Sequence, residues 1–280
     1  MSELEALLLG IVQGLTEFLP ISSSGHLIVV PWLQEYHFLQ DNEAFNKTFD
    51  VALHAGTLAA VLIYFRSEIV DLLRALWRSV RRRAVGGSEE RLAWAIVVGT
   101  IPAVIAGGLG ESLIEDHLGD PWQIAILLIV FGLLLGYADR RPQRKGLEDV
   151  GPRQGLYIGL AQVLSLAPGV SRSGITITAA RFLGLNRDSA ARISFLLLTP
   201  VTAGAVVFKA FGAASEGLPS GVAGPMIVGT IAAAVSGYLA IAGLIAFVRR
   251  HSYDVFVVYR VLLGIALLLL IATGVRGATF

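Results

Sequence analysis

Hydrophobic residues occupy long stretches of the chain, and two of these stretches are broken near the middle by a short polar segment. Six unbroken stretches approach the ~20 apolar residues that a helix needs to cross a bilayer. We predict spans at 49–65, 92–110, 122–138, 190–211, 225–248 and 256–274. The broken stretches are 4–33 and 155–184. We predict that each is a re-entrant helical hairpin whose polar tip is buried in protein or lines a wet cavity.

The composition is that of an integral membrane protein. Of the 280 residues, 55% are hydrophobic and only 15% are charged, whereas about a quarter of a soluble domain is charged. The absence of cysteine excludes disulfides, thiolate metal sites and cysteine nucleophiles. No Lys or Arg precedes Lys47, so we expect no cleavable signal peptide, which needs a basic start. The net charge of +1 gives no indication of nucleic acid, and we expect none as a partner.

Two basic segments separate the apolar stretches. Residues 66–83 carry apolar positions at helical spacing among several arginines. They form either an amphipathic helix on an anionic leaflet or an ordinary basic loop, and the pattern leaves both open. Residues 139–153 are basic and rich in loop formers, and we interpret them as the linker between two halves of the chain.

The two predicted hairpins share a motif, which indicates an internal duplication. Residues 10–25 and 159–174 both follow the pattern G-x-x-Q-x8-S-x-S-G, with a constant offset of 149 positions and a proline just before the serines. We therefore predict one membrane domain, 1–280, made of repeat one (1–145) and repeat two (150–280).

The distribution of Lys and Arg predicts the topology, because cytoplasmic loops collect these residues. Seven lie in 66–91, five in 139–153 and two at 249–250. Placing these segments in the cytoplasm puts both termini outside and lets the two hairpins enter from opposite faces. Three spans per repeat is an odd number, so the repeats are inverted. The predicted fold is an all-α integral membrane protein with two inverted-topology repeats, each a re-entrant helical hairpin plus three transmembrane helices, with the tips meeting near the midplane.

The residues at the predicted meeting point suit phosphoryl transfer. Each tip places serines at the start of a helix, where free N–H groups and the helix dipole attract anions. Arg172 adds a charged fork that matches phosphate oxygens. Glu17, the serines 22–24 and His26 supply a carboxylate, hydroxyls and an imidazole. An arginine would stabilise charge, a serine would attack, and His26 or Glu17 would handle its proton.

Simpler roles exist for each of these residues taken alone. Serines after a proline often only cap a helix, His26 can be structural, and Gln13 and Glu17 can bond neighbouring helices. Asp50 and His54 begin a span and are either structural or part of an access route. We expect basic residues near span ends to extend toward the membrane surface, namely Lys209, Arg249, Arg250 and Arg260. The histidines show no metal-ligand spacing.

The segments GIVQGLTEFLPISSSGH and PGVSRSGITIT closely resemble the two signature motifs of the bacterial undecaprenyl-diphosphate phosphatase family, which is associated with bacitracin resistance. Length and span pattern also fit, so the resemblance covers essentially the whole chain. It implies removal of the terminal phosphate of undecaprenyl diphosphate, which recycles the carrier lipid for cell-wall synthesis. It also implies a multi-pass protein of the bacterial cytoplasmic membrane with an active site open to the outer face.

Carried over by position, the resemblance implies a catalytic set and a phosphate-binding set. The catalytic set is Glu17, Ser23, His26 and Arg172, and the phosphate-binding set is Gln13, Ser22, Ser24, Ser171, Ser173 and Thr176. Position 13 is Gln where many relatives have Glu, and a single carboxylate provides too few ligands to bind a metal ion tightly. We therefore expect no tightly bound cofactor, and a divalent cation, Mg²⁺ or Ca²⁺, that arrives with the diphosphate.

Two other functions share features with this chain. Inverted repeats with broken helices are typical of transporters, so a lipid flippase is the alternative from another class. The acid-phosphatase-like lipid phosphatases also combine Ser-Gly-His and Ser-Arg elements, but they need a histidine soon after the Ser-Arg, where this chain has Ile177 and Thr178. The expected partners are the polyprenyl diphosphate and membrane lipid. A homodimer is also expected to be possible, because GxxxG spacings permit close helix contacts.

Overall fold

The computed structural model describes residues 1–34, 43–216 and 223–278, and within these ranges the chain is almost entirely helical. The first half contains α1 (Glu3–Phe18), α2 (Ser23–Gln34), α4 (Glu43–Tyr64), α5 (Arg66–Arg82), α6 (Ser88–His117) and α7 (Pro121–Asp139). The second half contains α8 (Pro152–Val163), α9 (Arg172–Phe182), α10 (Arg187–Glu216), α11 (Ala223–Val248) and α12 (Asp254–Ala272). The predicted all-α class is confirmed for the part of the chain that is described.

Five of the six predicted spans correspond to helices that are long and apolar enough to cross a membrane, namely α6, α7, α10, α11 and α12. The sixth, predicted at 49–65, passes this test only when α4 is taken together with α5, and these two helices meet at an angle of 79°. The segment 66–83 is thus a helix over most of its length, and its interpretation as a loop is wrong. Its position on a membrane surface stays a prediction.

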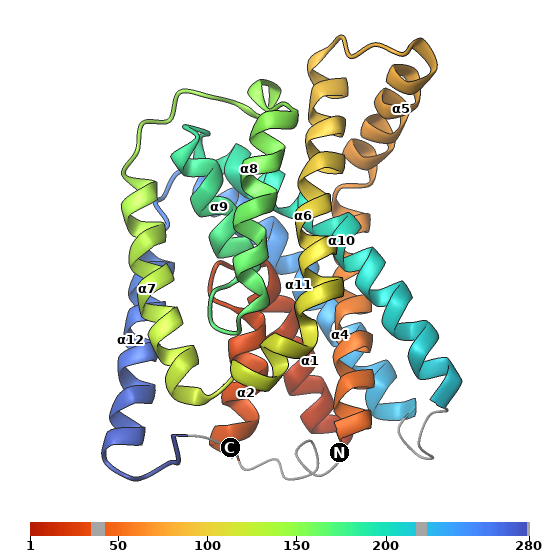
Figure 1. Ribbon diagram of the computed structural model, residues 1–280. Helices are drawn as coiled ribbons and strands as arrows, with labels where there is room; N and C mark the ends of the chain where they lie inside the picture. The colour runs from red at the N-terminus through yellow and green to blue at the C-terminus, as the bar shows by residue number, and fades with distance from the viewer. Residues whose placement is uncertain (35–42, 217–222, 279–280) are drawn as a thin grey trace.

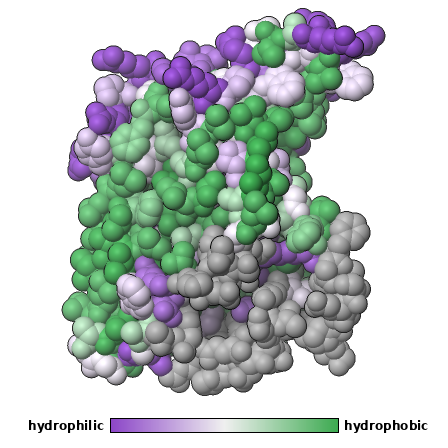
Figure 2. Space-filling view, in the orientation of Figure 1, coloured by the Kyte–Doolittle hydropathy of each residue, from purple (hydrophilic) through white to green (hydrophobic). Residues whose placement is uncertain are grey.

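The two broken stretches turn back inside the molecule (Figure 1). Helix α1 runs from the end that holds the N-terminus to the middle, where α2 starts back, and α8 and α9 make the corresponding turn from the opposite end. The end of α12 lies at the same end of the molecule as the start of α1. Hydrophilic residues gather at the opposite end, around α5, above a broad hydrophobic surface (Figure 2).

Each broken stretch packs its first helix against a long helix of the other half of the chain. Helix α1 lies against α11, and α8 lies against α6. Both crossings are so close that only glycine fits: a Cβ at Gly14 would lie 2.0 Å from the Ser236 hydroxyl, and a Cβ at Gly159 would lie 2.1 Å from the Gly99 carbonyl oxygen. The GxxxG spacings thus serve contacts within the chain, and a homodimer stays a prediction.

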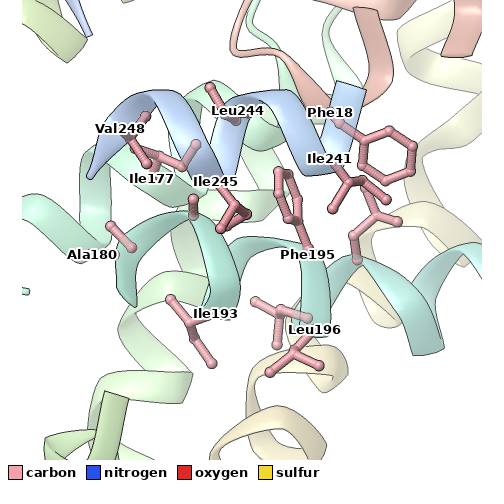
Figure 3. Packing of buried hydrophobic residues seen from close by; sticks show 14 of the residues in the cluster. Phe18, Ile177, Ala180, Ile193, Phe195, Leu196, Ile241, Leu244, Ile245 and Val248 are labelled. Atoms are coloured by element: carbon pink, nitrogen blue, oxygen red, sulfur yellow. The ribbon is translucent and has the colours of Figure 1, made fainter. Parts of the chain in front are cut away.

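The main hydrophobic core lies beside the end of α1. Phe18 is fully buried and meets Phe195 of α10 edge to face, with ring centroids 5.4 Å apart. Ile241 of α11 lies beside the two rings (Figure 3). An aromatic pair in this geometry contributes about 0.5–1.5 kcal/mol. The core therefore fixes the last turn of α1, which carries Glu17.

A buried ionic cluster joins the two halves of the chain between the end of α7 and the start of α10. The carboxylate of Asp139, at the end of α7, accepts bonds from Arg187 at 2.8 Å and from Arg181 at 3.2 Å. Arg181 is fully buried and also donates to the Arg141 carbonyl at 2.6 Å. These contacts fix the end of α9 and the start of α10 on the linker, and so hold the second broken stretch in place.

Candidate active site

The two turns have the same unusual backbone at corresponding positions. Ser22 and Ser171 have φ angles of 79° and 74°, a left-handed conformation that side-chain-bearing residues rarely adopt. Each serine hydroxyl accepts a bond from the N–H of the glycine three residues later, Gly25 at 3.3 Å and Gly174 at 3.1 Å. Such conformations cost about 1–3 kcal/mol and persist where the surroundings enforce them. Both serines therefore cap the helix that follows.

The two turns contact each other directly, as predicted. The N–H of Gly169 donates to the Ser22 hydroxyl at 3.1 Å, and the Ser173 hydroxyl donates to the Leu19 carbonyl at 3.0 Å. The two turns are therefore hydrogen-bonded to each other in both directions.

Arg260 of α12 clamps this contact, and the expectation that it extends toward the membrane surface is wrong. Its side chain is fully buried. It donates to the Pro20 carbonyl of the first turn at 3.3 Å, and to the Gly169 and Val170 carbonyls of the second at 2.9 and 3.0 Å. The five N–H donors of a guanidinium suit this role, because loop carbonyls inside a protein need partners.

Glu17 and Ser23 form the closest side-chain contact between the predicted catalytic residues. The Ser23 hydroxyl donates to Glu17 Oε2 at 2.5 Å, and the Gln13 amide donates to the same oxygen at 3.3 Å. The short distance is typical of a hydroxyl bonded to an ionised carboxylate. Glu17 is only 3% exposed, so its charge needs compensation inside the protein.

Arg172 supplies positive charge from the second turn. Its guanidinium lies 3.9 Å from Glu17 Oε1 and donates to the Thr202 hydroxyl of α10 at 2.9 Å. Glu17 Oε1 has no hydrogen-bond partner among the described residues. The carboxylate, the hydroxyl and the guanidinium thus come together, and the guanidinium keeps N–H groups beyond those it uses here.

The remaining predicted residues of the second turn are bonded within the protein. The Ser171 and Ser173 hydroxyls lie 3.3 Å apart. The Thr176 hydroxyl donates to the Arg172 carbonyl at 2.7 Å and lies 2.6 Å from the Ser194 hydroxyl. Thr176 therefore supports the helix start that carries Arg172.

His26 lies in the same turn as Ser23, and both of its ring nitrogens are occupied. Nδ1 lies 2.7 Å from the Ser22 carbonyl oxygen, and Nε2 lies 2.7 Å from the Tyr259 hydroxyl of α12. The Ser24 hydroxyl lies 3.5 Å from that of Ser22. Ser23 directs its proton to Glu17, so the geometry favours Glu17 over His26 as the proton acceptor.

Three residues that sequence reasoning did not assign to the site belong beside it. His54 of α4 has its Nε2 3.9 Å from Glu17 Oε2, and its Nδ1 3.4 Å from the Asp50 carboxylate. Thr202 orients Arg172. The spacing of Asp50 and His54 put them on one helix face, but nothing in the sequence indicated that this face turns toward α1.

The donor set does not suit a tightly held metal. In the ranges that the structure describes, no three His, Asp or Glu side chains come together as ligands. Glu17 approaches one histidine and one arginine, and a cation would have to compete with that arginine.

The fold and the site define a multi-pass helical membrane protein with a serine, a carboxylate and an arginine gathered at two broken helices. Residues 6–266 match the family described as bacitracin resistance protein BacA, and the chain belongs to this family. An undecaprenyl-diphosphatase of Geobacter sulfurreducens is 49% identical over 270 residues, covering 96% of this chain and 98% of the relative. The undecaprenyl-diphosphatases of Thermomicrobium roseum and Pelobacter propionicus are 46% and 43% identical, over 96% and 99% of this chain and 98% and 100% of their own lengths.

Proposed function

We propose that this protein hydrolyses undecaprenyl diphosphate to undecaprenyl phosphate and inorganic phosphate, the activity named for its relatives. Through this activity it recycles the carrier lipid for cell-wall synthesis and confers resistance to bacitracin, as the family description indicates. The observation that carries the proposal for the site is the 2.5 Å bond from Ser23 to Glu17 beside Arg172.

In the proposed mechanism, the Ser23 oxygen attacks the terminal phosphorus. Glu17 takes the serine proton as the O–P bond forms and the bond to the lipid phosphate breaks. Arg172 and the N–H groups at the starts of α2 and α9 stabilise the charge on the phosphoryl oxygens. Water then attacks the phosphoserine. His26, bonded to Ser22 and Tyr259, holds the first turn, and Gln13 holds the Glu17 carboxylate.

The arrangement of helices supports an inverted duplication. The positive φ angles recur 149 positions apart, at Ser22 and Ser171, and the first helix of each broken stretch packs on the other half. We therefore propose that 4–33 and 155–184 are re-entrant hairpins of two inverted repeats. By the charge distribution, we place the end that carries α5 in the cytoplasm, both termini outside, and the site open to the outer face of the bacterial inner membrane.

The decisive experiment measures phosphate release from a polyprenyl diphosphate by purified protein in detergent. We expect Ser23→Ala and Arg172→Ala to lower kcat by about 10²–10³-fold, as expected when a nucleophile or a charge-stabilising group is lost. Near-wild-type rates for both variants would overturn the site assignment. Trapping a phosphoserine at Ser23 would distinguish serine attack from direct attack by water.

The flippase alternative is not favoured. A transporter needs no hydroxyl bonded to a carboxylate, whereas a serine nucleophile needs a base to take its proton, and Glu17 is bonded to Ser23. Turnover in detergent, where no gradient exists, supports the enzyme, and binding without product would support transport.

We also propose that a divalent cation enters with the diphosphate, so that equilibrium dialysis without substrate detects no tight binding of Mg²⁺ or Ca²⁺.

A further inference from the structure

Asp50 and His54 form a pair in α4 that faces the proposed Ser23–Glu17 chemistry. His54 Nε2 and the Ser23 hydroxyl both approach the same oxygen, Glu17 Oε2, at 3.9 and 2.5 Å. On its other side, His54 Nδ1 lies 2.9 Å from the Asp50 carbonyl oxygen and 3.4 Å from the Asp50 carboxylate. The four side chains thus form a continuous row from the serine to Asp50.

The row changes from buried to accessible along its length. The Glu17 side chain is 2% exposed, that of His54 22% and that of Asp50 40%. Arg172 of α9 and Lys209 of α10 add positive charge beside the pair. Asp50 is therefore the most accessible member of the row.

The partners of His54 fix the position of its protons. Both groups at Nδ1 are oxygen acceptors, so Nδ1 carries a hydrogen. Nε2 faces a carboxylate oxygen, which is also an acceptor when ionised. At 3.9 Å this contact is longer than a hydrogen bond, so Nε2 is the ring nitrogen that can accept a proton from Glu17.

The reaction leaves a proton for this pair to remove. When serine attacks, one O–P bond forms, the bond to the lipid phosphate breaks, and the serine proton goes to Glu17. When water then attacks, one of its hydrogens stays with the phosphate and the other returns to the serine oxygen. The second half consumes no proton from outside, so each turnover leaves one proton on Glu17. Direct attack by water releases the same proton.

We infer that His54, held by Asp50, is a positioning residue that accepts this proton from Glu17 and passes it toward water. Glu17 is thereby restored to a carboxylate, which is the form that can deprotonate the attacking water in the second half. The inference rests on the proposed roles of Ser23 and Glu17.

The test compares His54→Gln, His54→Ala and Asp50→Asn with His251→Ala, a control in the exposed loop between α11 and α12. We expect His54→Gln to lower kcat about 10²-fold with KM within about twofold, because a glutamine side chain does not accept a proton near neutral pH. Asp50→Asn should lower kcat about tenfold, and His251→Ala should leave it unchanged. Added imidazole should restore part of the kcat of His54→Ala. The pH dependence of kcat should lose its acid limb in both His54 variants.

Three results would overturn the inference. The first is a wild-type kcat for His54→Gln while Ser23→Ala is inactive, which leaves the proposed function standing. The second is a loss in His54→Ala that imidazole does not restore and that comes with a lower melting temperature in detergent, which indicates a structural role. The third is full activity of Ser23→Ala and Glu17→Gln, which removes the proposed site itself.

Discussion

The two turns share a backbone and differ in chemistry. Ser22 and Ser171 have the same left-handed conformation and the same capping bond. The residues at the proposed catalytic positions differ between the two turns. Glu17, Ser23 and His26 of the first turn correspond to Leu166, Arg172 and Ile175 of the second. The comparison teaches that the two turns share a backbone frame, and that the proposed mechanism divides proton transfer and charge stabilisation between them.

This division predicts that glutamine introduced at corresponding positions of the two turns has unequal effects on kcat. Glu17→Gln removes the proton acceptor of Ser23, and we expect kcat to fall about 10³-fold. The matched control, Leu166→Gln, changes a half-buried residue at the corresponding position and should leave kcat within about twofold. Phosphate release from purified variants measures both. Equal losses in the two variants would contradict the division.

The repeated motif in the sequence predicted which segments lie close together. The sequence did not predict how the helices are rotated and angled against each other. The recurring glutamine, proline and serines predicted that two polar tips meet, and their contact is present. The bend between α4 and α5 falls where the predicted span ends, at Phe65, but no pattern in the sequence gives its angle of 79°.

Arg260 and His54 show the limit most clearly. Both lie on helices, α12 and α4, whose sequences show which face is apolar. The sequences do not show which neighbouring helix each face packs against. Position near a span end favoured an exposed Arg260, whereas the carbonyls of two turns surround it. A side chain that acts on a distant turn leaves no local pattern, so only the packing of α12 and α4 reveals these roles.

Arg260 holds both turns, so its loss should affect them together. Arg260→Met leaves several buried carbonyls without a donor, and each costs about 1–3 kcal/mol. We expect a clear fall in melting temperature in detergent, together with loss of activity. Arg249→Met is the control, because that arginine is 57% exposed and pairs with Asp188, which contributes at most about 1 kcal/mol. A wild-type melting temperature for Arg260→Met would contradict the clamp.

The two glycine crossings should respond alike if the frame is duplicated. Gly14→Ala would force a Cβ against Ser236, and Gly159→Ala would force one against the Gly99 backbone. Overpacking of this kind costs about 1–3 kcal/mol, and we expect both variants to lower the melting temperature. Gly243→Ala, in α11, meets nothing within 4 Å and serves as the control. A loss confined to one of the two crossings would show that the halves are held differently.

The smallest expected effect concerns the glutamines that the motif repeats. Gln13 donates to Glu17, whereas neither polar atom of the buried Gln162 side chain has a hydrogen-bond partner among the described residues. Burying unpaired amide atoms costs free energy, so Gln162→Leu should keep the activity and leave the melting temperature equal or slightly higher. Gln13→Leu should lower kcat about tenfold, since the loss of one bond to the carboxylate is worth about 1.5 kcal/mol. If Gln162→Leu instead lowers kcat as much as Gln13→Leu does, the second glutamine contacts the reaction, and the chemistry is shared between the turns more evenly than their side chains indicate.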